Sequence, residues 1–127
     1  MQPSCAVQKS ALLLLNTLDR AFEKEHHHSF TLHVNQIKEN SRAGQISIKS
    51  TTCVSLETFV GIVKHYGYSL KEAMTLELSL QIPQTTAVEH VRLFFKELQE
   101  SIGNNTNCLF EFNITQEKTC TMIVTFK

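Results

Sequence analysis

The chain has little of what nucleotide-dependent enzymes need. Its 127 residues include four glycines, two prolines, no tryptophan and one aspartate, Asp19. With so few glycines it contains neither a GxGxxG nor a GxxxxGK(S/T) pattern, which excludes phosphate-binding loops of the Rossmann and P-loop types. Lysine plus arginine equals aspartate plus glutamate at twelve each, so the basic excess typical of proteins that grip a phosphate backbone is also missing.

Long apolar runs are also lacking. The longest near the N-terminus, Ala11 to Leu15, is too short for the apolar core of a signal peptide and far below the ~20 residues that span a bilayer. We therefore expect a cytoplasmic or nuclear protein without a membrane segment. The hydrophobic content of 42% with 19% charged residues is typical of a globular protein, and the length suits one domain over residues 1–127.

The four cysteines show no CxxC spacing, and a reducing compartment favours free thiols. Cys108 has the strand parity of Phe110, and Cys120 has that of Met122. Both thiols are therefore predicted to face the core as small hydrophobic groups.

Apolar residues at helical spacing predict three helices. The first covers residues 5–25 and begins after a candidate N-cap, Ser4. The second covers residues 55–66, with Gly67 at the position of a C-cap glycine. The third is predicted to start at Thr85 or Thr86, because Glu89 completes a capping box, and to end near Gly103.

Alternation of apolar and polar residues predicts five strands, over residues 30–35, 45–50, 73–82, 108–115 and 119–126. In the second strand Ile46 and Ile48 should face inward. The last two strands form a hairpin whose loop must be odd in length. A two-residue turn would set Phe112 opposite Thr121 and split the apolar face, whereas an odd loop pairs Phe112 with Cys120 or Met122.

The predicted class is α+β, with the order α-ββ-α-β-α-ββ, a largely antiparallel five-stranded sheet and helices packed on one of its faces. The two outer α-ββ units have similar apolar patterns 80 residues apart: Leu14, Leu18, Phe22, Phe30, Leu32 and Val34 precede Phe94, Leu98, Ile102, Phe110, Phe112 and Ile114. Duplication would explain this. The few identities favour a generic resemblance between amphipathic units.

No reactive constellation stands out. The run from His26 to His28, with His33 nearby, lacks the spacing of metal ligands, so we expect no metal or cofactor. Cys53 precedes the second helix and would need a base such as His65, but no nucleophile signature surrounds it. His90 stands alone, and the glutamates fall on predicted polar faces. We therefore expect no enzymatic activity.

Two functional hypotheses follow. The first is a protein-protein interaction module, a dimer or a subunit of a larger complex. It would use the surplus apolar residues of the first helix, Leu12, Leu13 and Leu15, and strand 73–82 if that strand lies at an open sheet edge. The alternative is a nucleic-acid-binding accessory protein that uses basic residues around the first hairpin, namely Lys38, Arg42 and Lys49.

Overall fold

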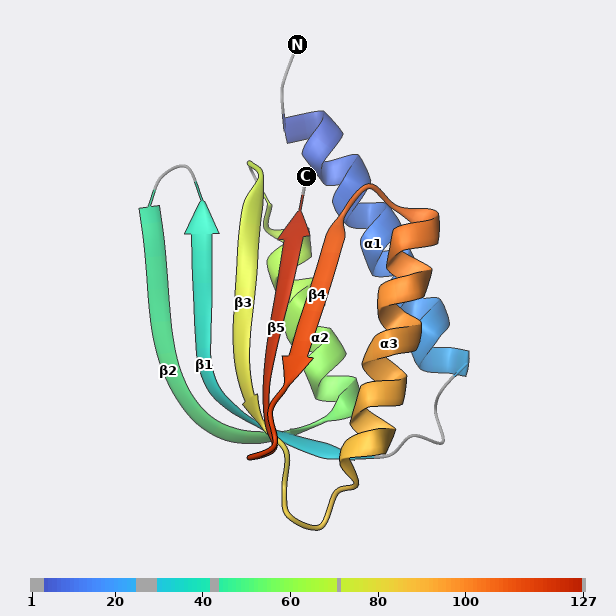
Figure 1. The fold of residues 1–127 in the computed structure, drawn as a ribbon. Coiled ribbons are helices and arrows are strands. Elements are labelled where there is room, and N and C mark those ends of the chain that lie inside the picture. The colour runs from blue at the N-terminus through green and yellow to red at the C-terminus, as the bar shows by residue number, and fades with distance from the viewer. Residues whose placement is uncertain (1–3, 25–29, 42–43, 71, 127) are drawn as a thin grey trace.

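The computed structural model describes residues 4–24, 30–41, 44–70 and 72–126. Within them lie three helices and one five-stranded sheet (Figure 1). In chain order the elements are α1 (Ser4–Lys24), β1 (Thr31–Ser41), β2 (Gly44–Ser55), α2 (Leu56–Tyr68), β3 (Met74–Gln81), α3 (Val88–Asn105), β4 (Leu109–Ile114) and β5 (Thr119–Phe126). The α+β class and the order α-ββ-α-β-α-ββ predicted from the sequence are confirmed.

The sheet is antiparallel throughout, with the strand order β2-β1-β3-β5-β4. All three helices lie behind one face of it, and no helix or strand of the described residues covers the opposite face, which we call the open face (Figure 1). One expectation is wrong: β3 was a candidate edge strand, but it lies in the centre between β1 and β5. The free edges belong to β2 and β4.

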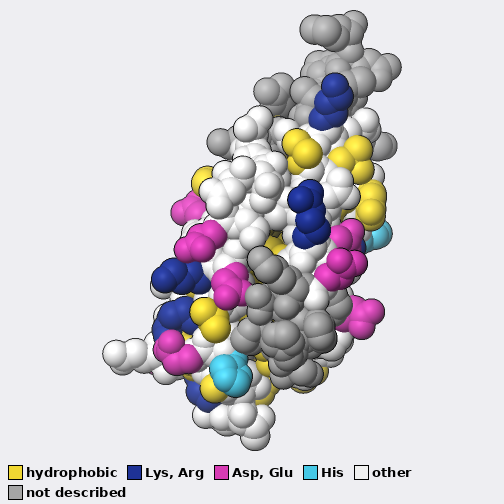
Figure 2. Space-filling view, turned by 90° about the vertical axis from the view of Figure 1, so that its right-hand side faces the viewer, with side chains coloured by type: hydrophobic (Ala, Val, Ile, Leu, Met, Phe, Trp, Pro, Cys, Tyr) yellow, Lys and Arg dark blue, Asp and Glu magenta, His cyan; other side chains and the backbone are white. Residues whose placement is uncertain are grey.

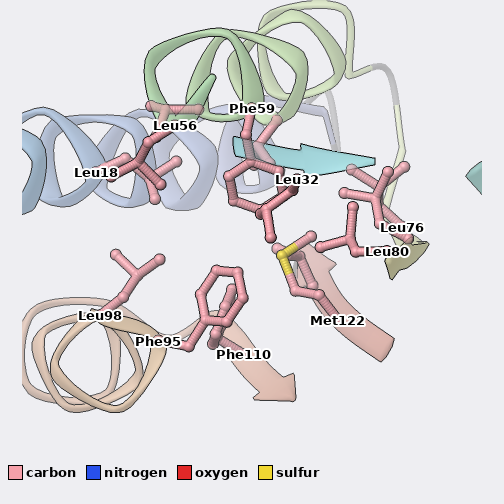
Figure 3. Packing of buried hydrophobic residues seen from close by; sticks show 14 of the residues in the cluster. Leu18, Leu32, Leu56, Phe59, Leu76, Leu80, Phe95, Leu98, Phe110 and Met122 are labelled. Carbon is pink, nitrogen blue, oxygen red and sulfur yellow. The ribbon is translucent and has the colours of Figure 1, made fainter. Parts of the chain in front are cut away.

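The core lies between the helices and the inner face of the sheet. Figure 3 shows labelled side chains from α1, α2 and α3 and from β1, β3, β4 and β5 pointing toward one another. Every second residue of β3 and of β5 is buried on this side, which is the alternation expected for strands with one covered face. The buried positions of these two strands are Leu76, Leu78, Leu80, Cys120, Met122, Val124 and Phe126.

The C-terminal hairpin has the predicted odd loop. Phe112 pairs with Met122, and Thr115 donates its N–H to the carbonyl of Thr119 at 2.9 Å, which leaves three residues in the turn. The last of them, Lys118, has a φ of 62° in the left-handed region. The apolar face therefore stays intact along both strands.

The two α-ββ units are not copies of one another in the sheet. The second strand of each hairpin lies on the same side of its first strand, in the direction from β4 toward β2. However, β1 and β4 run in opposite directions, because every neighbouring pair is antiparallel. No rotation in the plane of the sheet superposes such hairpins with the helices kept on one face. The topology thus supports generic resemblance over duplication.

Several predicted element ends differ from the observed ones. Both β1 and β2 extend beyond their predicted ends, since β1 is paired on both sides along most of its length. Helix α2 continues past Gly67 to Tyr68. Gly67 is therefore not the C-cap, and its role is steric: a Cβ there would lie 3.0 Å from Cδ2 of Leu15, so glycine permits the close approach of α1 and α2.

The start of α3 also differs. The helix begins at Val88, its N-cap is Ala87, and no side chain caps it. Thr85 and Thr86 therefore do not act as the N-cap. Thr86 instead donates its N–H to the carbonyl of Pro83 at 3.0 Å, within a turn that precedes the helix.

Candidate functional site

Of the three leucines of α1 predicted to contact a partner, two are exposed and one is buried. Leu12 and Leu13 are about half exposed, whereas Leu15 is 2% exposed and packs in the core against α2. Leu15 is therefore corrected from a contact residue to a core residue. The face formed by α1 and α3 carries basic and acidic side chains interspersed, with apolar side chains in small separate groups (Figure 2).

The predicted basic patch is only partly described. Lys38 and Lys49 lie on the open face of the sheet, and Arg42 lies outside the described residues. Lys38 is in register with Glu77 of β3 on the same face, so an acidic group offsets its charge. Nucleic-acid binding remains the alternative hypothesis from the sequence, and nothing in this geometry favours it over the first.

Cys53 lies in strand β2, not in a loop before α2. Its Sγ is 3.7 Å from Nδ1 of His33, across the β1–β2 pair on the open face. This contact does not make a catalytic dyad, because no carboxylate is found to orient His33 among the hydrogen bonds of the described residues and the pair lines none of the described hollows.

The remaining sequence candidates form no reactive centre in the part of the chain that the structure describes. His26 to His28 lie outside it, and no group of three or more histidine, cysteine or acidic side chains is placed to hold a metal ion there. His65 lies on α2 with its ring 5.5 Å from that of Tyr66, and His90 is exposed on α3. None of the described helices has the length and apolarity to cross a membrane.

The reactivity of the cysteine thiols tests whether Cys53 is an activated nucleophile. Burial raises the pKa of the Cys120 thiol from 9.0 to about 12, and Cys108 is also buried. In a Cys5→Ser variant we expect iodoacetamide to alkylate Cys53 at the rate of an ordinary exposed thiol. Cys108 and Cys120 should react only after unfolding. Mass spectrometry of tryptic peptides checks this, and much faster labelling of Cys53 would contradict the expectation that this thiol is not activated.

The raised pKa of the Cys120 thiol also predicts how the stability of the protein changes at alkaline pH. The native state holds the Cys120 proton more tightly than the unfolded chain does, since its pKa is higher when folded. Stability should therefore fall as the pH rises from 9.0 through about 12. Urea unfolding at several pH values should show a shallower fall for Cys120→Ala. An equal fall in both proteins would contradict this role for the thiol.

The feature that stands out is an apolar surface where β2 and β1 extend beyond the helices. Ile46 and Ile48 face the helix side of the sheet, because their register partners on β1 lie opposite the buried Leu76 and Leu78 of β3. They are nevertheless 56% and 45% exposed. Figure 1 shows the reason: none of the three described helices lies behind the part of the sheet where β1 ends and β2 begins.

Beside these isoleucines lies a groove of about 390 Å³ between α2 and β1. Its lining is mainly apolar and comprises Ile37, Thr58, Gly61, Ile62, His65 and Tyr66. A smaller hollow of about 160 Å³ lies along Glu39, Ile46 and Met74. We call the surface formed by Ile37, Ile46, Ile48, Ile62 and Tyr66 the α2–β2 patch.

A polar pair links this patch to the smaller hollow: Tyr66 belongs to the patch and Glu39 lines the hollow. Burial raises the pKa of the Tyr66 hydroxyl, and a hydrogen bond to Glu39 together with the charge of that carboxylate raises it further. The phenol therefore stays protonated at neutral pH and donates to the carboxylate. Such a pair gives an otherwise apolar surface a fixed polar point, a common arrangement in protein-binding sites.

The strand that carries the two exposed isoleucines is also an open edge. β2 has 12 residues, and β1 pairs with it on one side only. Sequence reasoning found the alternation of Ile46 and Ile48 but assigned both to the core. It missed the half-buried Ile37, Ile62 and Tyr66 as the lining of a groove, since only the strand order shows which apolar positions the helices cover incompletely.

Comparison with protein families, curated proteins and solved structures found no match for this chain. A functional proposal therefore depends on the residues and contacts described above.

Proposed function

We propose that this chain is a non-enzymatic protein-protein interaction module that binds another protein chain through the α2–β2 patch and the edge of β2. The observation that carries the proposal is the exposure of Ile46 and Ile48 beside an apolar groove. Contiguous exposed apolar surface on a folded domain is typical of a docking surface, because leaving it in water is unfavourable. The module would act as a dimer or as a subunit of a larger complex.

The patch combines two means of binding. The free edge of β2 can pair with an extended segment through backbone hydrogen bonds, and the groove beside it can take apolar side chains from the same segment. Tyr66 and Glu39 add a polar point that favours one orientation of the bound chain. Leu12 and Leu13 on α1 remain a predicted second contact surface.

The proposed compartment is the cytoplasm or the nucleus. Cys120 is buried as a free thiol, and Cys53 is exposed as one. Two unpaired thiols among the described residues fit a reducing environment better than an oxidising one.

Site-specific photo-crosslinking tests the proposal. A photoreactive residue in place of Ile62, within the patch, should crosslink to one or a few defined proteins in cells that express the chain naturally. The same residue in place of Thr121, on the open face of the sheet, is the matched control and should give no defined product. Mass spectrometry identifies each product, and the purified partner must then bind the purified chain.

A second substitution links the crosslink to the patch. Ile48→Lys adds a charge to an exposed position, so it should leave the fold intact and abolish the crosslink from position 62. Equal crosslinking from Ile62 and Thr121, or a crosslink from Ile62 that survives Ile48→Lys, would overturn the proposal.

A further inference from the structure

We propose that the chain docking on the edge of β2 is a second copy of this protein, paired antiparallel to β2 about a two-fold axis at Ser47. The inference rests on the proposed function, because it uses the same surface, and it adds the identity of the partner and the register. Two five-stranded sheets would then form one continuous sheet of ten strands.

The edge of β2 lacks the features that keep edge strands apart. Proteins commonly protect an edge with proline, charged side chains, short length or a covering element. β2 has 12 residues without proline, and Lys49 carries its only charge. The other edge strand, β4, has six residues, carries Glu111 and contacts α3. The unprotected edge is thus the one beside the apolar patch.

The backbone of β2 sets which residues can pair. The hairpin closes with Ser41 paired to Gly44 across a two-residue connection, so these residues face one another for hydrogen bonding. Successive residues then direct their N–H and C=O groups to alternate sides. Gln45, Ser47 and Lys49 therefore direct theirs to the free edge, away from β1.

The shape of the strand limits the pairing segment. The pairing of β2 with β1 is regular from Gly44 to Lys49 and shifts before Thr52. Figure 1 shows that β2 is straight toward its hairpin end and curves at the other end, where it leads directly into α2. A second strand can pair along the straight part without meeting α2.

Within this part of β2 the side chains favour one register. An axis at Ile46 or at Ile48 also fits the backbone, but it would place one isoleucine of each copy opposite Gly44 or Ser50 and so leave it without an apolar partner. An axis at Ser47 places Ile46 of each copy opposite Ile48 of the other, on the helix side of the sheet, and places Gln45 opposite Lys49 on the open side. An axis at Lys49 would set two ammonium groups directly opposite, which is unfavourable. An axis at Gln45 would leave an overlap of only residues 44–46, because the strand begins at Gly44.

The Ser47 axis also buries what the single chain leaves exposed. Four isoleucine side chains, Ile46 and Ile48 of both copies, would form one cluster that continues to Ile37 and the groove of each copy. The formal net charge of zero means that two copies do not repel one another at long range. A second copy therefore fits this edge in three respects: its backbone groups can pair with those of β2, its isoleucines cover the exposed isoleucines, and its net charge does not oppose association.

Sedimentation velocity over a concentration series tests the dimer. Wild type should be dimeric at micromolar concentration. Ile48→Lys would place a charge in the cluster, and Ser47→Pro would remove the N–H at the axis. Each should raise the dimer Kd by about ten-fold or more, with unchanged circular dichroism. Leu109→Lys is the matched control, because Leu109 is 46% exposed on the other edge strand, and it should leave the Kd unchanged.

Cysteine crosslinking tests the register. Only a residue on the two-fold axis meets its own copy, so Ser47→Cys in a Cys5→Ser, Cys53→Ser background should oxidise to a covalent dimer, whereas Lys49→Cys should not. Preferential crosslinking of Lys49→Cys would overturn the proposed axis. A monomer in sedimentation whose Ile62 position still crosslinks to another protein would overturn the second copy and leave the proposed function standing. A monomer without any crosslink would overturn both.

Discussion

Phe95→Ala should lower the free energy of unfolding by about 3–5 kcal/mol, the largest loss that we expect from truncating one side chain of this protein. Phe95 is fully buried on α3 and joins the helices to the sheet. Its ring centroid lies 5.6 Å from those of Phe59, Phe94 and Phe112, and 6.1 Å from that of Phe110. Truncation would remove four aromatic contacts together and leave a cavity at the centre of the core (Figure 3).

Urea unfolding followed by circular dichroism measures this loss. Leu93→Ala is the matched control, because Leu93 lies on the same helix but is exposed, and its effect should stay within about 0.5 kcal/mol. Similar losses for both variants would contradict the central place of Phe95 in the core.

Lys118→Met should lower the free energy of unfolding by about 2 kcal/mol, because a charged donor is lost to three backbone acceptors at once. The Nζ of Lys118 donates to the carbonyls of Gln84 at 2.9 Å, Thr86 at 3.1 Å and Pro83 at 3.5 Å. The β4–β5 turn is thereby tied to the connection between β3 and α3. Methionine keeps the apolar part of the side chain but offers no donor.

The backbone of Lys118 provides the internal control. Its φ of 62° is unfavourable for a side chain with a Cβ, so Lys118→Gly should lose the same hydrogen bonds but regain about 1 kcal/mol. Thermal unfolding should therefore rank wild type above the glycine variant and the glycine variant above the methionine variant. Lys96→Met, on an exposed position of α3, should have little effect. A methionine variant as stable as wild type would contradict the role of the amine.

The element order could be predicted from the sequence because each element carries its own period. Leu76, Leu78 and Leu80 alternate with polar residues, and Phe94, Phe95 and Leu98 recur at helical spacing. The odd hairpin loop followed from parity alone, since a slip of one residue would turn Phe112 to the other face. These predictions needed no knowledge of which strands are neighbours.

The strand order could not be predicted in the same way. β3 has the most regular alternation in the chain, and this regularity says only that one face is buried. Its position in the centre, between β1 and β5, depends on pairing between residues far apart in the sequence. The same pairing extends β1 to Ser41, through a polar stretch that resembles a loop in isolation.

The candidate site could not be predicted from the sequence for a related reason. Ile46 and Ile48 have the pattern of core residues, and they do face the helix side of the sheet. They are exposed because α2 does not extend behind the end of β2 that follows the β1–β2 connection. The length of a helix and its placement on the sheet depend on the whole fold. Leu15 shows the converse: its position predicts a surplus apolar residue of α1, and it is buried against Gly67.

Residue-resolved amide hydrogen exchange along β2 tests most directly whether another chain docks on this edge. We expect exchange at Gln45, Ser47 and Lys49 to slow when the protein is concentrated or mixed with a partner captured through Ile62, while Glu111 on the other edge strand is unaffected. Exchange at these three amides that stays fast under both conditions would contradict docking on β2.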